Sequence, residues 1–457
     1  MKIFKSFITL LILTVLGRPL ITVSTAQPVA TNQIVVMISI DGLAAFYFDD
    51  PLAEMPTLHR LASEGAQAKQ MRASTPTVTW PNHTTLVTGV TPARHGVVGN
   101  NFFDRQHGTN FMLITDPVLD KDQIVKVPTL YDLAKTQGLA TLGIRWPVTR
   151  NAHSLDWVLP DMKSTEIIRK FTTPALLTEC TQAGLPMLSG FETQGCGDAY
   201  CTKVFNHFLQ THPPTLALLH LINVDHIQHE KGPRTPEAYA AIKTADEQVG
   251  EVWAELQRDF PGRATLFVVS DHGFSPVKRT ILPNVILRKA GLLSDQATPS
   301  NNLVGVVPQG GSVMIYVRNE AQAQRDDILA RARKAFTGIP GVAKIVGTDE
   351  FKAYGVADPQ VDPHAPDLIV FADEGCAFGK TTAGDALFVD KTEVAGTHGH
   401  DPNLPHMHAS FIAWGAGIKP GSQLGTMNNT DVAPTIARLL QLNLPQPDGR
   451  VLEEILK

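Results

Sequence analysis

Three apolar runs of this chain each lead into an aspartate, and this pattern limits the possible folds more than any other feature. The runs with their acids are residues 33–40 with Asp41, residues 215–223 with Asp225, and residues 264–270 with Asp271. Nearly continuous apolar runs are typical of strands buried on both faces of a parallel sheet. Ligands of open parallel sheets bind at the carboxyl ends of the strands, so the acids predict a polar site at that edge.

Helical patterns separate these runs. Residues 56–64, 131–136 and 235–257 have apolar side chains at helical spacing, and each segment ends at or shortly before a glycine or proline. Strands that alternate with helices indicate an α/β fold. We therefore expect a central, mostly parallel sheet with helices on both faces.

The segment from residue 275 to residue 392 departs from this alternation. It contains a Gly-Gly pair, a short strand over residues 312–317 and an amphipathic helix over residues 320–337. We interpret it as an inserted cap subdomain, after which residues 409–414 return the chain to the main sheet. The catalytic core would then comprise residues 27–274 and 393–457.

The first 26 residues predict a signal peptide. A charged start is followed by an apolar stretch over residues 6–16, which is too short to span a bilayer, and small residues precede Gln27. The alternative is an N-terminal anchor, which Gly17, Arg18 and Pro19 disfavour because they interrupt the apolar stretch. We expect a periplasmic or secreted protein without stable membrane insertion after cleavage.

Charge and cysteine content narrow the function classes. The net charge of −5 comes without a basic stripe, which argues against a protein that coats nucleic-acid polymers. The four cysteines suit an oxidising compartment, and the absence of a CxxC pair disfavours a cysteine zinc site. We interpret them as structural disulfides, with three possible pairings among Cys180, Cys196, Cys201 and Cys376.

Acids and histidines at the predicted strand ends have the types and spacing of metal ligands. Asp225 and His229 stand four residues apart, so a helical turn would place both on one face. Asp271 and His272 are adjacent, and His398 follows the insertion. Mixed carboxylate and imidazole ligation favours zinc. A bound cation would also relieve the repulsion among acids that converge at one edge.

The stretch around Thr79 indicates a helix start. Thr79 offers a side-chain oxygen that would cap a helix beginning at Pro81, and proline is favoured in the first turn. A helix N-terminus also favours a bound phosphate. These residues alone leave open whether Thr79 is only a cap or also takes part in chemistry.

Several motifs closely resemble those of the nucleotide pyrophosphatase/phosphodiesterase family of the alkaline phosphatase superfamily. In order along the chain they are residues 39–42, 79–83, 87–89, 95–100, 225–229, 270–274, 396–399, 431–435 and 448–450. The resemblance implies an alkaline-phosphatase-like fold. It also implies hydrolysis of phosphodiester or pyrophosphate bonds in a small phosphoester substrate that resembles a nucleotide.

The resemblance further implies roles for individual residues. Two Zn²⁺ ions per chain would be bound, one by Asp41, Asp271 and His272 and the other by Asp225, His229 and His398. Thr79 would be the nucleophile, would also contact the first ion, and would form a covalent phosphothreonine. Asn100 would bind a phosphate oxygen together with a backbone N–H near Thr79 or Trp80. His400 stands where the family usually has Tyr and is the fallback ligand.

Several positions leave alternatives open. Trp80 stands where the family usually has Phe, near the substrate entrance. Arg145 would either clamp a phosphate or make an ordinary salt bridge, and Trp146, Phe102 and Phe103 would form either a base-stacking wall or ordinary core. A free cation at the phosphate would favour the alternative of a phosphomonoesterase. A phosphonate hydrolase on the same scaffold also stays open.

Two other function classes are disfavoured. A catalytically dead binding module would have lost its nucleophile or its ligands, and every expected position is filled. A sulfatase would carry Cys or Ser at the position of Thr79. Of the remaining histidines, we interpret His83, His95 and His220 as packing or supporting residues.

Overall fold

The computed structural model describes residues 33–115, 119–294 and 302–457 of the chain. The predicted signal peptide over residues 1–26 lies outside this part. The segment Thr31–Lys457 forms one compact unit. Within the described residues, every helix is too short or too polar to cross a membrane.

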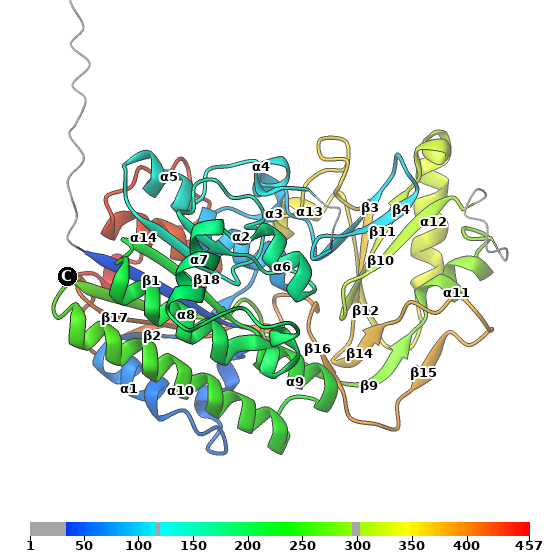
Figure 1. The fold of residues 1–457 in the computed structure, drawn as a ribbon. Coiled ribbons are helices and arrows are strands. Elements are labelled where there is room, and N and C mark those ends of the chain that lie inside the picture. Colours follow the sequence, from blue (N-terminus) through cyan, green and yellow to red (C-terminus); the bar gives the residue numbers. More distant parts are fainter. Residues whose placement is uncertain (1–32, 116–118, 295–301) are drawn as a thin grey trace, which may run out of the picture. The chain divides into compact units, whose positions relative to one another are not determined.

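A mixed sheet with the strand order β18-β2-β17-β8-β1-β7-β5-β6 forms the centre of the fold (Figure 1). Strand β17 is antiparallel to both of its neighbours, and the other pairs are parallel. The three predicted apolar strands are the adjacent β8, β1 and β7, which confirms the mostly parallel sheet. The bounds are β1 Ile34–Ile40, β2 Ala66–Arg72, β5 Thr141–Ile144, β6 Trp157–Leu159, β7 Leu216–Leu221, β8 Ala264–Val269, β17 Phe411–Gly415 and β18 Ser422–Asn428.

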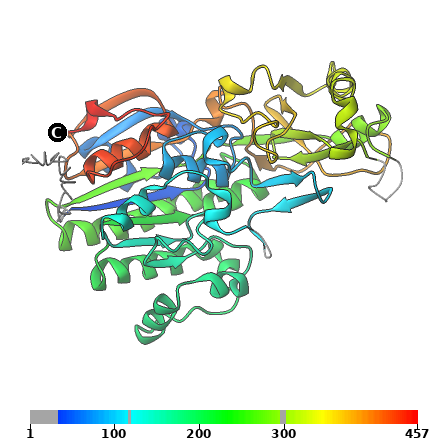
Figure 2. The same ribbon diagram turned by 90° about the horizontal axis from the view of Figure 1, so that it is seen from above.

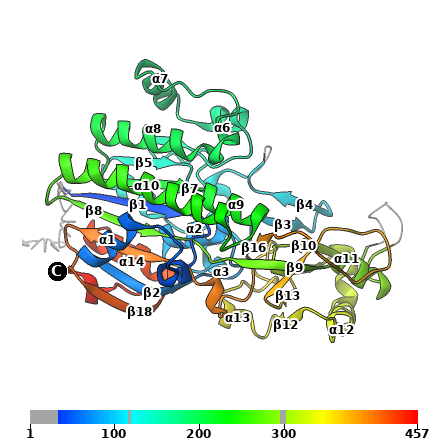
Figure 3. The same cartoon turned by 90° about the horizontal axis from the view of Figure 1, so that it is seen from below.

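Helices cover both faces of this sheet because alternate side chains of β1 enter two different cores. Val36 and Ile38 pack with helices α1, α8 and α10, whereas Val35 and Met37 pack with α2, α5 and α14. Figures 1 and 3 show these helices on opposite sides of the strands. Their bounds are α1 Pro56–Glu64, α2 Thr79–Thr88, α5 Leu130–Thr136, α8 Asp198–Thr211, α10 Pro236–Asp259 and α14 Val432–Leu439.

The predicted insertion contains a second sheet with the strand order β10-β11-β13-β12, and its own apolar core. Figures 1 and 2 show it beyond the carboxyl ends of the central strands. Its elements are β9 Ser275–Ile281, α11 Pro283–Lys289, β10 Val304–Pro308, β11 Ser312–Val317, α12 Arg325–Phe336, β12 Val342–Gly347, α13 Phe351–Tyr354, β13 Leu368–Ala372, β14 Gly375–Phe378 and β15 Phe388–Asp390. The helix expected over residues 320–337 is wrong in its first turn, because Asn319–Gln324 is a 3-10 turn and α12 begins at Arg325.

Short elements complete the fold around the ends of the central strands. They are α3 Pro92–His95, β3 Asn101–Asp104, β4 Thr109–Met112, α4 Lys121–Ile124, α6 Thr165–Phe171, α7 Pro174–Gln182, α9 Asn223–Lys231 and β16 Gly396–Thr397. Strand β16 pairs with β9 and so links the insertion to the core.

The expected disulfides are wrong, because all four cysteines are free thiols in the structure. Cys180 and Cys201 are buried in the main core, where they pack as small apolar side chains. Cys196 lies in a 3-10 turn before α8, and Cys376 lies on β14 in the insertion.

Asp246 of α10 caps the neighbouring helix α1. Its carboxylate accepts the N–H groups of Thr57 at 3.0 Å and of Leu58 at 2.7 Å, and α1 has no side-chain cap of its own. We expect Asp246→Ala to lower the free energy of unfolding by about 1–3 kcal/mol, because it leaves these N–H groups unpaired. Calorimetric unfolding measures the change. Glu247→Ala, at an exposed neighbouring position, is the control, and equal stability of the two variants would contradict the cap.

Candidate active site

The sheet topology brings the three predicted acids together. Asp41 directly follows β1, Asp271 follows β8 after one residue, and Asp225 lies in the first turn of α9 just after β7. Because β8, β1 and β7 are adjacent, the acids meet at one edge. Asp41 and Asp271 are buried, with at most 2% of their surface exposed.

Two groups of side chains at this edge have the geometry of a metal site. One comprises Asp41, Asp271 and His272, and the other comprises Asp225, His272 and His398; within each, the possible ligand atoms lie within 4.8 Å of one another. The first group is the first predicted ligand set. The second differs from the prediction, because His272 stands between both groups. Its Nε2 is 3.3 Å from Asp41 Oδ1 and 3.2 Å from Asp271 Oδ2.

The other two predicted ligands flank Asp225. His398 Nε2 is 3.5 Å from Asp225 Oδ1, and His229 Nε2 is 3.4 Å from Asp225 Oδ2. Both Asp225 and His229 belong to α9, and their four-residue spacing places them on one face of this helix, as expected. The ring of His398 also stacks on that of His272, with centroids 3.7 Å apart.

Backbone carbonyl groups fix the orientation of all three imidazoles. Each ring donates its Nδ1–H to a carbonyl oxygen, which leaves Nε2 to face the carboxylates. The bonds are His229 to Gly396 at 3.1 Å, His272 to Gly273 at 3.1 Å and His398 to Thr77 at 3.0 Å. This tautomer is the one that binds a metal through Nε2.

Four of the inward-facing atoms have no hydrogen-bond partner in the described part of the chain. They are Asp41 Oδ1, Asp225 Oδ1, Asp271 Oδ2 and His272 Nε2. Buried polar atoms are normally paired, and these are acceptors of the kind that coordinate divalent cations. The residues present therefore fit a metal centre.

Burial favours the neutral forms of these side chains, so it raises the pKa values of the aspartates and lowers that of His272. A bound metal ion would favour the ionised aspartates instead. Burial, and then the charge of Asp225, raise the pKa of Asp41 well above its usual range. Burial and the charge of Asp41 do the same to the pKa of Asp271. Burial lowers the pKa of His272 to about 3, so its imidazole is neutral and able to ligate. The site thus combines neutral imidazoles with carboxylates that ionise only against a cost, which a divalent cation offsets.

Thr79 is the first residue of α2 and does not cap it. The N-cap position belongs to Val78, which has an extended backbone and no side-chain cap. The predicted capping role is therefore wrong, because the helix begins two residues earlier than Pro81. One hydrogen bond joins this turn to the metal groups, because Thr77 O accepts from His398. Thr79 O accepts the Nδ1–H of His83 at 2.9 Å. His83 Nδ1 is also 3.5 Å from Asp271 Oδ2.

Asn100 lies beside this turn, as the resemblance implies. The Trp80 N–H donates to Asn100 Oδ1 at 2.8 Å. That bond holds the side-chain amide at the N-terminus of α2 and leaves its NH₂ group available to a ligand.

Arg145 and Trp80, the predicted substrate-binding residues, are both buried. Arg145 is buried and pairs with Asp161 at 2.9 Å between Nη2 and Oδ1, so the salt-bridge alternative is the one realised. Trp80 is 5% exposed and packs in the main core, so its indole ring is not available for stacking on a substrate. Trp146 and Phe102 are likewise core residues.

His400 lies outside both metal groups. Its Nε2–H donates to the carbonyl oxygen of Cys376 at 2.9 Å, and its ring packs against Gly311 in the insertion. Of the two histidines that the sequence offered, His398 is the one beside the carboxylates.

His220 contacts a predicted metal ligand, which its interpretation as an ordinary packing residue missed. Its Nε2 is 3.0 Å from Asp41 Oδ2, and its Nδ1–H donates to the carbonyl oxygen of Arg145 at 3.0 Å. A single polar side chain in the buried strand LALLHL was the available signal. Strand pairing places His220 opposite Ser39, close to Asp41.

We expect His220→Ala to weaken the binding of a divalent metal ion by roughly 10–100-fold, because it removes the group that orients Asp41. Competition with a chromogenic chelator measures the affinity. His107→Ala, whose side chain is 64% exposed, is the control and should bind as the unsubstituted protein does. Unchanged affinity in His220→Ala would show that Asp41 needs no support.

Comparisons with known proteins identify the family of the chain. The chain is 24% identical to human ectonucleotide pyrophosphatase/phosphodiesterase family member 5 over 92% of this chain and 76% of that protein. It is 23% identical to venom phosphodiesterase 2 of Crotalus adamanteus over 91% of this chain and 46% of that protein. The chain therefore spans about half the length of the venom relatives.

A solved structure shares the fold. Murine ectonucleotide pyrophosphatase/phosphodiesterase 5, an inactive variant in complex with AMP, superposes with a TM-score of 0.70 at 19% identity, over 93% of this chain and 100% of that one. The sequence model of one family, described as type I phosphodiesterase/nucleotide pyrophosphatase, matches residues 35–401. Because that match covers most of the chain, the protein belongs to the type I phosphodiesterase/nucleotide pyrophosphatase family.

Proposed function

We propose that the protein hydrolyses phosphodiester or pyrophosphate bonds of nucleotide-like small molecules, with Thr79 as nucleophile and two Zn²⁺ ions as cofactors. The observation that carries this proposal is the placement of Thr79 at the N-terminus of α2. The carbonyl oxygen of Thr77 accepts from His398, and His83, which donates to Thr79 O, lies 3.5 Å from Asp271 Oδ2. This placement supports a site in which the proposed nucleophile, a helix end suited to an anion and the proposed metal ligands act together.

Two sets of residues would hold the ions. They are Asp41, Asp271 and His272 for the first ion and Asp225, His229 and His398 for the second, with His272 near both. When bound, divalent ions at this edge would lower the pKa of the Thr79 hydroxyl and neutralise charge on the phosphate.

The reaction would proceed in two displacements. Thr79 Oγ1 would form a bond to phosphorus as the bond from phosphorus to the leaving oxygen breaks, which gives a phosphothreonine. Water would then attack phosphorus, and the bond to Thr79 Oγ1 would break. The NH₂ group of Asn100 and the N–H of Thr79 would donate to the nonbridging oxygens throughout, while the N–H of Trp80 holds Asn100.

The pairing of Arg145 favours a diester over a monoester. A monoester carries more negative charge and calls for an additional cation at the phosphate. Arg145, the clamp candidate, is held by Asp161 in a buried pair. The AMP complex of the murine relative supports a nucleotide-like substrate. The relatives' names, which denote ectoenzymes and venom enzymes, support the proposal of a periplasmic or secreted protein.

We expect the zinc-loaded protein to prefer a chromogenic phosphodiester to the matching monoester in kcat/KM. Thr79→Ala should lower kcat by at least about 10³-fold, because it removes the attacking oxygen. Thr79→Ser keeps a hydroxyl and should retain a substantial part of the turnover. Near-normal turnover in Thr79→Ala would refute the nucleophile, and a monoester preference would move the assignment to a phosphatase.

Metal removal should destabilise the protein more at alkaline than at acidic pH. In the metal-free protein the folded-state pKa values of Asp41 and Asp271 lie above the ordinary 3.8, so their stabilising protonated forms are lost as pH rises. Metal replaces those protons and binds more strongly at higher pH. We therefore expect a chelator to lower Tm more at about pH 8 than at about pH 5.5. An equal decrease at both values would contradict a carboxylate-bound metal.

A further inference from the structure

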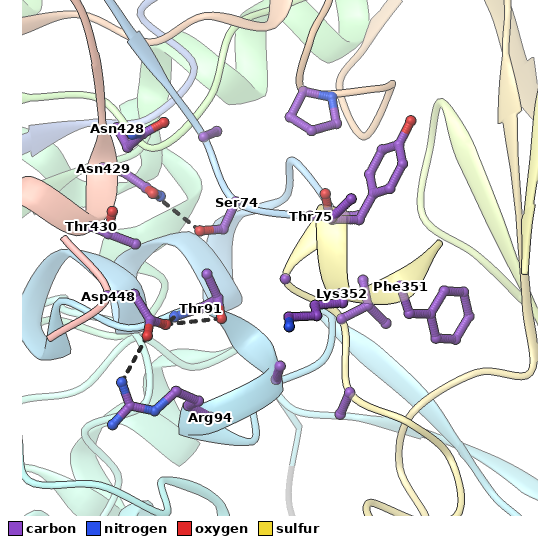
Figure 4. A pocket seen from close by; sticks show the side chains of 18 of the residues that line it. Ser74, Thr75, Thr91, Arg94, Phe351, Lys352, Asn428, Asn429, Thr430 and Asp448 are labelled. Carbon is purple, nitrogen blue, oxygen red and sulfur yellow. Dashed lines mark hydrogen bonds and ion pairs between the residues drawn. The ribbon is translucent and has the colours of Figure 1, made fainter. Parts of the chain in front are cut away.

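A cavity of about 720 Å³ lies between the core and the insertion (Figure 4). Its walls come from the end of β2, from α3, from α13 with the residues after it, and from residues 428–430. None of the residues of the two metal groups lines it. A cavity of this size would hold a ligand as large as a mononucleotide.

Positive side chains outnumber negative ones in this cavity. Arg72, Arg94 and Lys352 line it together with Asp358 and Asp448. Arg94 Nη1 pairs with Asp448 Oδ1 at 2.7 Å. Among the described residues, Arg72 and Lys352 have no carboxylate at ion-pair distance. Figure 4 shows Lys352 extending from α13 into the space between the walls. The charge of the cavity therefore favours an anion.

The remaining lining combines a hydroxyl group with apolar surface. Thr75 is 1% exposed, and its hydroxyl has no hydrogen-bond partner in the described part of the chain. An unpaired buried hydroxyl is destabilising, so a ligand that accepts its hydrogen bond would be favoured. Phe351, Val356 and Ala357 supply the apolar surface. An anion with an attached ring would match both parts.

Asn82 connects the cavity wall to the turn that carries Thr79. Its Oδ1 accepts the N–H of Ser74 at 2.7 Å and the Nδ2–H of Asn429 at 2.8 Å, and both partners line the cavity. Its Nδ2–H donates to the carbonyl oxygen of Val78 at 2.8 Å. Because Val78 directly precedes Thr79, a ligand that holds the wall also holds this turn.

We propose that the cavity is a second binding site, for a small phosphate-bearing anion with an attached ring, and that its occupancy is coupled to the Thr79 turn through Asn82. Arg72 and Lys352, the two lining cations without a carboxylate partner among the described residues, would bind the phosphate. The ring lies on the apolar wall. A nucleoside monophosphate has this chemistry, and its identification as a reaction product rests on the proposed function.

Equilibrium dialysis with AMP tests the binding. We expect metal-loaded Thr79→Ala protein to bind an additional equivalent of AMP compared with the same protein that also carries Arg72→Gln and Lys352→Gln. Equal stoichiometry in the two proteins overturns the site. Lys69→Gln, at an exposed position on the same strand β2, is the matched control and should keep the additional equivalent. Its loss in the control would indicate general surface charge and would also overturn the site.

Hydrogen exchange tests the coupling without relying on turnover. AMP should slow the exchange of amides in residues 74–82 more in Thr79→Ala protein than in the protein with all three substitutions. Equal protection in both overturns the coupling. Neither measurement requires hydrolysis, so failure of the proposed function and failure of this second site are distinguishable.

Discussion

Carboxylates gathered at a buried edge are the constraint on which this structure depends. Asp41 and Asp271 follow adjacent strands whose apolar side chains enter both cores, and Asp225 follows the next strand. Burial raises the pKa of each of the three acids. Such a cluster is unfavourable unless something compensates the charge. The imidazoles around the cluster, and the cation that they would help to bind, would compensate this charge.

Hydrogen bonds to main-chain atoms set the orientation of the three imidazoles and of Asn100. Carbonyl oxygens of Gly396, Gly273 and Thr77 hold the three imidazoles, and a backbone N–H holds Asn100. The backbone positions follow from the sheet and from the start of α2, so the precision of the site comes from the fold itself. Substitutions far from the edge that shift these segments would disturb the ligands as effectively as substitutions of the ligands.

The sequence predicted features that depend on local pattern and missed those that depend on tertiary packing. The apolar strands with their acids, and the helical pair Asp225 and His229, appear as expected because both follow from periodicity. His272 stands between both metal groups because β8 lies next to β1, which no spacing in the sequence reveals. The buried pair of Arg145 with Asp161 likewise joins residues whose approach only the folded chain determines.

Other misses have equally physical causes. The helix begins at Thr79 because Val78 has an extended backbone, whereas residue preferences predicted Thr79 as the cap. All four cysteines are free thiols, and a disulfide depends on the distance and orientation of two residues in the fold, which the number of cysteines does not reveal. His220 appeared ordinary since a lone histidine in a strand is usually a packing residue, and only the contact with Asp41 distinguishes it.

The bond from His398 to Thr77 spans 321 residues of sequence. On a ribosome, the strands that carry the three acids emerge well before His398 does. Any product that ends before His398 would therefore carry all three acids and Thr79 but would lack one of the imidazoles that lie beside those acids.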